Sequence, residues 1–142
     1  MASILLRVPI DANRDSIFDA LATSAGVRGW WNNHTEGPSG LDSTMSVSFP
    51  DAPMPFEFRV TDQSPGHRVA WRCVAGPPEW IGTDLSFEIQ QGDDGSTSVL
   101  FTHGGWETTE ESFPFIAYSW AQILPRLKNL AESGQVKPFF DF

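Results

Sequence analysis

The sequence has few of the residues that form disulfides or bind metals. Cys73 is its only cysteine, so no intrachain disulfide can form. The three histidines, His34, His67 and His103, are far apart, and no Cys-x-x-Cys pair accompanies them. The glycine patterns of phosphate and dinucleotide sites and the Gly-x-Ser-x-Gly pattern of hydrolases are also missing. We therefore expect no metal and no cofactor.

Positive charge and long apolar runs are also scarce. Nine Lys and Arg stand against eighteen Asp and Glu, which gives a net charge of −9 at pH 7. Such a surface repels phosphate backbones and anionic lipids, so we expect neither nucleic acid nor a membrane as partner. No apolar run approaches the roughly 20 residues that cross a bilayer, and the first residues lack a signal-peptide pattern. These observations predict a cytoplasmic protein.

Aromatic residues, by contrast, are abundant. The chain has six Trp and eleven Phe within 142 residues, a length that predicts a single domain over residues 1–142. Its content of 40% hydrophobic and 19% charged residues is typical of a globular chain. So many large rings in a small domain predict either a thick core or an aromatic-lined cavity.

Several short segments alternate apolar and polar residues between turns, which is typical of antiparallel strands with one buried face. The predicted strands are Ser3–Ile10, Thr44–Phe49, Phe56–Thr61, His67–Val74, Trp80–Gln90 and Ser96–Gly104. The sequence Gly92-Asp93-Asp94-Gly95 predicts a hairpin between the last two strands. Residues 32–40 are dense in turn residues and predict a loop.

Two short helices are predicted after the first strand, and one long helix near the end. Asn13 is a favourable N-cap for a helix to about Thr23, and Val27–Trp31 predicts a second helical turn. From Phe113 the apolar positions recur at a period near 3.6 up to a stop at Gly134. This long amphipathic helix is the predicted cover for the apolar face of the sheet.

The order of these elements, together with short motifs, resembles the START-like or SRPBCC superfamily. Within it, the chain is most similar to the branch named for activators of the heat-shock-protein-90 ATPase. The motifs are the Trp30-Trp31 pair, residues 82–87, residues 97–106, and the run from Tyr118 to Gly134. The resemblance covers nearly the whole chain.

The resemblance implies an α+β helix-grip fold, in which a curved antiparallel sheet wraps around the long C-terminal helix and two short helices follow the first strand. It also implies a cavity between sheet and helix. Members of the superfamily bind lipids, hormones and polyketides, and some catalyse cyclisation or dehydration. The name of the branch implies a co-chaperone role.

Residues on the predicted inner faces are the candidate ligand contacts, because pockets for small molecules are mostly apolar with few polar groups. We predict a lining formed by Phe56, Phe58, Trp71, Cys73, Trp80, Phe87, Phe101, His103, Trp106, Ile116 and Trp120. Trp80 and Trp106 are expected at its mouth. The alternative is a filled core without a cavity.

His103 shares its predicted inner face with Val99 and Phe101. It could orient a ligand or act as a general base, or it could be a structural histidine whose ring is satisfied near the strand end. Asp84 and Glu88 fall on the opposite face, where polar alternation predicts solvated carboxylates.

The main functional hypothesis is non-catalytic binding of an apolar small molecule. The alternatives are an enzyme of the cyclase or hydrolase type with His103 as base, and a co-chaperone-like interaction module. One polar group in an apolar lining favours binding, because catalysis usually needs a positioned pair or triad. The apolar terminus, Phe139 to Phe142, predicts docking onto its own domain or a contact in a homodimer. A frayed tail is the less favoured alternative, because exposed aromatic residues promote aggregation.

Overall fold

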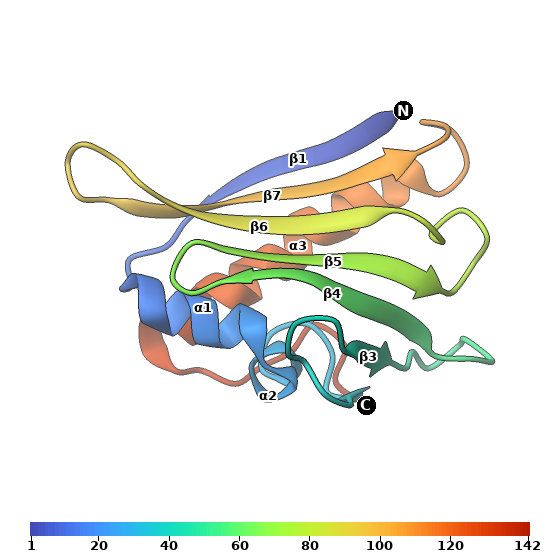
Figure 1. Ribbon diagram of the computed structural model, residues 1–142, viewed down its shortest axis with the longest axis horizontal. Helices are drawn as coiled ribbons and strands as arrows, with labels where there is room; N and C mark the ends of the chain where they lie inside the picture. Colours follow the sequence, from blue (N-terminus) through green and yellow to red (C-terminus); the bar gives the residue numbers. More distant parts are fainter.

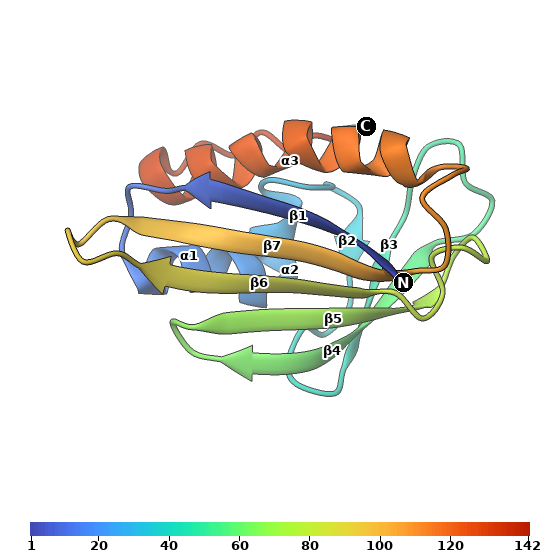
Figure 2. The same cartoon turned by 90° about the horizontal axis from the view of Figure 1, so that it is seen from above.

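The computed structural model describes all residues from Met1 to Phe142. A curved antiparallel sheet is covered on one face by a long helix and two short ones (Figures 1 and 2). The elements in chain order are β1 (Ala2–Pro9), α1 (Arg14–Ala22), α2 (Ser24–Arg28), β2 (Thr35–Glu36), β3 (Thr44–Val47), β4 (Phe56–Ser64), β5 (Arg68–Ala75), β6 (Asp84–Gln91), β7 (Thr97–Trp106) and α3 (Phe113–Ser133). This is the predicted α+β helix-grip arrangement.

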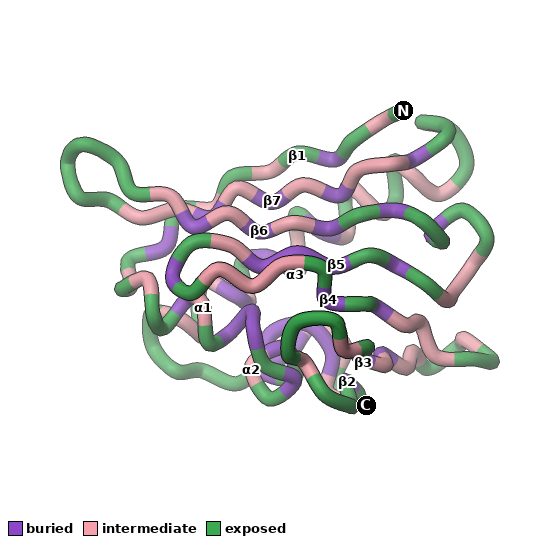
Figure 3. Tube along the Cα trace, viewed as in Figure 1, coloured by how far each residue is buried: buried purple, intermediate pink, exposed green.

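The seven strands lie in the order β1-β7-β6-β5-β4-β3-β2. Strands β2 to β7 therefore follow one another as hairpin neighbours, while β1 returns to the far edge beside β7. Buried residues alternate with partly or fully exposed ones along the strands, as the period of two requires (Figure 3). The register of β4 and β5 shifts between Val60 and Asp62, a bulge of the kind that bends a strand and increases its twist.

Local signals account for the helix ends. The side chain of Asn13 accepts a hydrogen bond from the Ser16 N–H at 2.8 Å, and Thr23 caps α2 in the same way through the Gly26 N–H at 2.9 Å. Helix α3 ends where Gly134 adopts φ 75°, a left-handed conformation that glycine adopts without a Cβ clash. The predicted cap at Asn13 and the predicted stop at Gly134 are confirmed.

Several boundaries differ from the prediction, and the second short helix, predicted over Val27–Trp31, spans Ser24–Arg28 instead. The strand predicted over Trp80–Gln90 begins only at Asp84, because residues 80–83 form a turn in which the Thr83 N–H donates to the Trp80 carbonyl at 3.0 Å. Strand β2 lies in the predicted loop and has only two residues. Its pairing with β3 is a tertiary contact, which local turn propensity does not reveal.

The C-terminal segment Lys137–Phe142 runs beside the chain that follows α2. The Phe139 and Phe140 N–H groups donate to the carbonyls of Trp30 and Trp31 at 3.1 and 2.9 Å, and the Asn33 N–H donates to the Phe140 carbonyl at 3.0 Å. The terminus therefore docks on its own domain, one of the two predicted arrangements.

Candidate functional site

Aromatic side chains fill the centre of the space between α3 and the sheet. The ring of Trp31 stacks on Trp71 with centroids 6.1 Å apart and an interplanar angle of 10°. Trp71 contacts Phe87 at 5.0 Å, Phe87 contacts Phe101 at 5.1 Å, and Phe101 contacts Trp120 of α3 at 4.7 Å. These five rings are at most 1% exposed, so no ligand-sized space is left here.

A pocket of about 170 Å³ opens beside this filled centre, where the first half of α3 meets the loops beyond β3 and β5 and the C-terminal segment. Its lining consists of Trp31, Phe49, Phe56, Trp80, Phe115, Ile116, Ser119, Trp120, Ile123 and Phe140. The volume is close to that of an engineered cavity of about 150 Å³ that binds benzene. It is below the roughly 300–1,000 Å³ of pockets for drug-sized molecules.

The pocket is uncharged. Ser119 is its one polar side chain, and its hydroxyl donates to the Phe115 carbonyl at 2.9 Å within α3. No ionisable side chain lines the space, so the walls offer contact area without a group that could transfer a proton.

The C-terminal segment and the loop after β3 form one wall of the pocket. Phe140 packs edge-on against Phe49 with centroids 4.9 Å apart, and Phe49 contacts Phe56 at 4.7 Å. Phe56 in turn contacts Trp80 at 5.2 Å. Four rings thus surround the space opposite α3. They come from the C-terminal segment, the loop after β3, strand β4 and the turn between β5 and β6.

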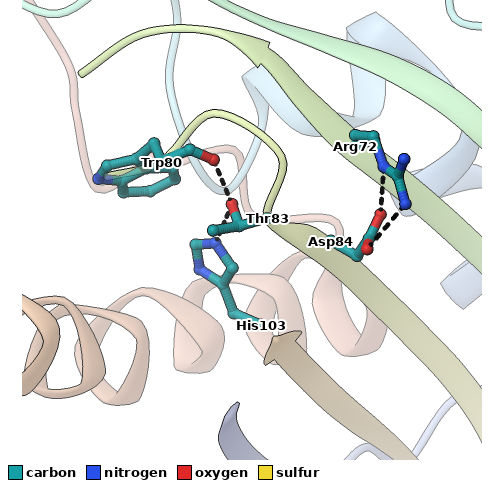
Figure 4. A network of polar contacts seen from close by, with 5 residues as sticks. All are labelled: Arg72, Trp80, Thr83, Asp84 and His103. Carbon is teal, nitrogen blue, oxygen red and sulfur yellow. Dashed lines mark hydrogen bonds and ion pairs between the residues drawn. The ribbon is translucent and has the colours of Figure 1, made fainter. Parts of the chain in front are cut away.

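His103 is fully buried behind the pocket. Its Nδ1 accepts a hydrogen bond from the Trp120 indole at 3.1 Å, and its Nε2 lies 2.9 Å from the Thr83 hydroxyl. The hydroxyl also contacts the Trp80 carbonyl at 2.6 Å (Figure 4). Burial lowers the pKa of His103 to about 3, so the ring is neutral at physiological pH. Both ring nitrogens are hydrogen-bonded to protein groups, as expected if His103 is a structural histidine.

Other chemically active groups are also in ordinary structural roles. Burial raises the pKa of the Cys73 thiol to about 11, which keeps it protonated. On the outer face of β6, Asp84 pairs with Arg72 at 2.9 Å, as Figure 4 shows, and Glu88 lies 3.8 Å from Arg68. The solvated carboxylates predicted there are thus each beside an arginine.

The structure brings four of the eleven predicted lining residues to the pocket: Phe56, Trp80, Ile116 and Trp120. The other seven do not line it and are at most 2% exposed; they are Phe58, Trp71, Cys73, Phe87, Phe101, His103 and Trp106. The reason is packing, because Trp31 and Trp120 occupy the space that these inward-facing sheet residues would otherwise enclose.

Trp106 was expected at the mouth of the cavity, but it packs inside. Its ring contacts His103 at 4.8 Å and Trp80 at 5.7 Å, and its indole N–H has no hydrogen-bond partner. Its position at the end of β7 turns it inward, toward the start of α3, where it meets Phe113 at 5.7 Å.

Sequence reasoning missed six lining residues: Trp31, Phe49, Phe115, Ser119, Ile123 and Phe140. Ile123 belongs to the apolar stripe predicted for the long helix. Two others also carried a signal, since Trp31 belongs to the double-tryptophan motif and Phe140 to the apolar terminus. The pairing of these two segments, which brings both rings to the pocket, is not visible in either segment alone.

A curved antiparallel sheet wrapped around one long helix is the fold of the START-like, or SRPBCC, proteins. Residues 11–132 match the family described as activator of Hsp90 ATPase homolog 1-like protein, and the chain belongs to this family. No functionally curated protein matches it.

Solved structures agree with this membership. The solution structure of the Aha1 dimer from Colwellia psychrerythraea is 33% identical with a TM-score of 0.83, covering 94% of this chain and 98% of that one. Protein SSP2350 from Staphylococcus saprophyticus is 14% identical with a TM-score of 0.75 and 96% coverage of both chains. Protein BH1534 from Bacillus halodurans is 18% identical with a TM-score of 0.74, covering 93% and 98%. The last two show the fold alone.

No helix of the structure combines the length and the apolar character needed to cross a membrane.

Proposed function

We propose that this domain binds a small apolar molecule, about the size of one aromatic ring, without transforming it. The observation that carries the proposal is the pocket of about 170 Å³ with nine hydrophobic side chains among its ten lining residues. Binding is favoured over catalysis because the lining holds no ionisable group and because both nitrogens of His103 are already hydrogen-bonded. A whole lipid or polyketide exceeds the volume, so a larger ligand would insert only one apolar end.

Fluorobenzene is a suitable probe, with binding followed by fluorine NMR. We expect saturable binding with a Kd on the order of 0.1–1 mM, which matches the small contact area of a single ring. Ser119→Trp places a large side chain into the pocket from α3 and should abolish binding. Asn129→Trp adds the same side chain at an exposed position of α3 outside the pocket and should bind as the wild type does. Equal binding by the two variants would contradict the proposal.

We also propose that two copies of the chain associate through the outer face of α3. Residues Phe113–Pro125 contain no charged side chain, and Phe115 and Tyr118 on this face are 67% and 65% exposed. Two copies with a net charge of −9 each repel one another, so an uncharged apolar face is the favourable place for contact. The Colwellia relative, which was solved as a dimer, supports this proposal.

Sedimentation velocity tests the association. Tyr118→Glu adds a negative charge to this face and should shift a dimer to a monomer. Leu5→Glu makes the same change at an exposed leucine on β1, away from α3, and should leave the dimer intact. A wild-type chain that stays monomeric at high protein concentration would contradict the proposal.

A further inference from the structure

A buried chain of hydrogen bonds connects two walls of the pocket. It runs from the Trp120 indole to His103 Nδ1 at 3.1 Å, from His103 Nε2 to the Thr83 hydroxyl at 2.9 Å, and from that hydroxyl to the Trp80 carbonyl at 2.6 Å. Trp80 and Trp120 line the pocket, whereas Thr83 and His103 do not. Figure 4 shows the part of the chain that links His103, Thr83 and the Trp80 carbonyl.

The chain has only one arrangement of protons. An indole N–H can only donate, so His103 Nδ1 must be the acceptor. The neutral imidazole then carries its proton on Nε2 and donates it to the Thr83 hydroxyl. The hydroxyl accepts this bond and donates its own hydrogen to the Trp80 carbonyl. Each of the three donors has one acceptor, so the chain is fully satisfied.

The two ends of the chain belong to elements that are distant in sequence. Trp80 lies in the turn between β5 and β6, and Trp120 lies on α3, while His103 sits on β7 between them. All four residues are at most 6% exposed, so water cannot replace a broken bond at little cost. A different orientation of the Trp120 ring would leave its N–H unpaired in an apolar interior.

We propose that His103 and Thr83 are positioning residues: they hold the ring of Trp120 and the backbone of Trp80 in the places that shape the pocket for a flat, ring-sized ligand. The inference rests on the proposed binding function and adds to it a pair of residues that act on the ligand only through other residues. They determine the distance between the wall at the β5–β6 turn, which carries Trp80, and the wall formed by α3.

Thr83→Val tests the proposal because valine keeps the shape of threonine but cannot accept from His103 or donate to Trp80. We expect its Kd for fluorobenzene to rise about 5- to 10-fold, while Thr83→Ser, which restores the hydroxyl, rescues most of the affinity. Thr102→Val is the matched control, because Thr102 faces outward on the same strand as His103, and it should bind as the wild type does. Kd values are compared only among variants that have been shown to be folded.

A second readout is the hydrogen exchange rate of the Trp120 indole N–H in proton–nitrogen NMR spectra. We expect faster exchange in Thr83→Val than in the wild type and Thr83→Ser, since His103 is no longer held from its other side. If Thr83→Val fails to fold, His103→Leu replaces it, and His103→Gln, whose amide supplies one acceptor and one donor, becomes the rescuing variant.

The outcomes separate this inference from the binding proposal. If the wild type binds fluorobenzene and Thr83→Val binds it equally well, the positioning role is overturned and the binding function stands. If the wild type binds no probe, the binding function fails. In that case the hydrogen exchange rate of the Trp120 indole tests the positioning role. An unchanged rate in Thr83→Val would overturn it.

Discussion

The space between α3 and the sheet is built differently at its centre and at its rim near the start of α3. At the centre, Trp71, Phe87 and Phe101 of the sheet meet Trp31 and Trp120 directly, and the space is filled. Toward the start of α3, the wall opposite the helix consists of loop and terminal residues such as Phe49 and Phe140, and a pocket remains. The difference indicates that regular elements packed face to face leave little room, whereas irregular segments at the rim can leave a hollow.

The sharpest expected contrast is in stability. Trp71→Ala removes a large ring from the filled centre, where it is 1% exposed, and should lower the free energy of unfolding by about 3–5 kcal/mol. Phe140→Ala removes a ring from the pocket wall, which already borders empty space, and should cost less than about 2 kcal/mol. Urea unfolding of both variants measures the difference, and equal losses would contradict the distinction between the two regions.

A second contrast concerns the buried polar group in the filled region. The ordinary pKa of histidine is 6.5, and the pKa of His103 in the folded chain is about 3. Between these pH values the unfolded chain binds a proton at His103 that the folded chain does not bind. The resulting stabilisation is present above pH 6.5 and is lost as the pH falls toward 3. Between pH 6.5 and about pH 4.5 the loss should be roughly 2–3 kcal/mol.

The reference for this measurement is His103→Gln, which cannot titrate and retains all the carboxylates of the wild type. Urea unfolding at several pH values should show a steeper loss of stability for the wild type than for this variant. Parallel pH profiles would show that His103 takes up a proton in the folded state as readily as in the unfolded chain.

The reactivity of the Cys73 thiol measures how tightly the inner face of β5 is packed. Its raised pKa of about 11, against an ordinary value of 9, lowers the thiolate fraction by about 100-fold at neutral pH, and burial further limits access. The native thiol should therefore react with Ellman's reagent at least about 100-fold more slowly than the thiol of the urea-unfolded chain. A rate within tenfold of the unfolded chain would reveal frequent opening of this part of the core.

The smallest effect is expected on the outer face of the sheet. Arg72 and Asp84 form two hydrogen bonds of 2.9 and 3.1 Å, but both side chains are more than half exposed. Because water and salt screen such pairs, Arg72→Met should leave the urea midpoint within experimental error of the wild type. A clear loss in this variant would mean that the Arg72–Asp84 pair contributes to stability despite its exposure.

Much of the fold followed from local patterns in the sequence. Alternation placed Leu85 and Phe87 on the inner face and Asp84 on the outer face, and the period near 3.6 placed Trp120 on the face of α3 that packs on the sheet. The site was predicted only in part, because alternation identifies which side chains face inward but not whether another ring already fills the space before them.

The sequence by itself determined the order of every element except β2, their inner faces, the cap at Asn13 and the stop at Gly134, since these depend on residues a few positions apart. Only the tertiary structure decided which inward-facing rings form a filled core and which border a pocket. That outcome depends on Trp31 and Phe140, which are far apart in the sequence and are brought together by backbone hydrogen bonds. The volume left between such segments is a property of their packing, and no single segment encodes it.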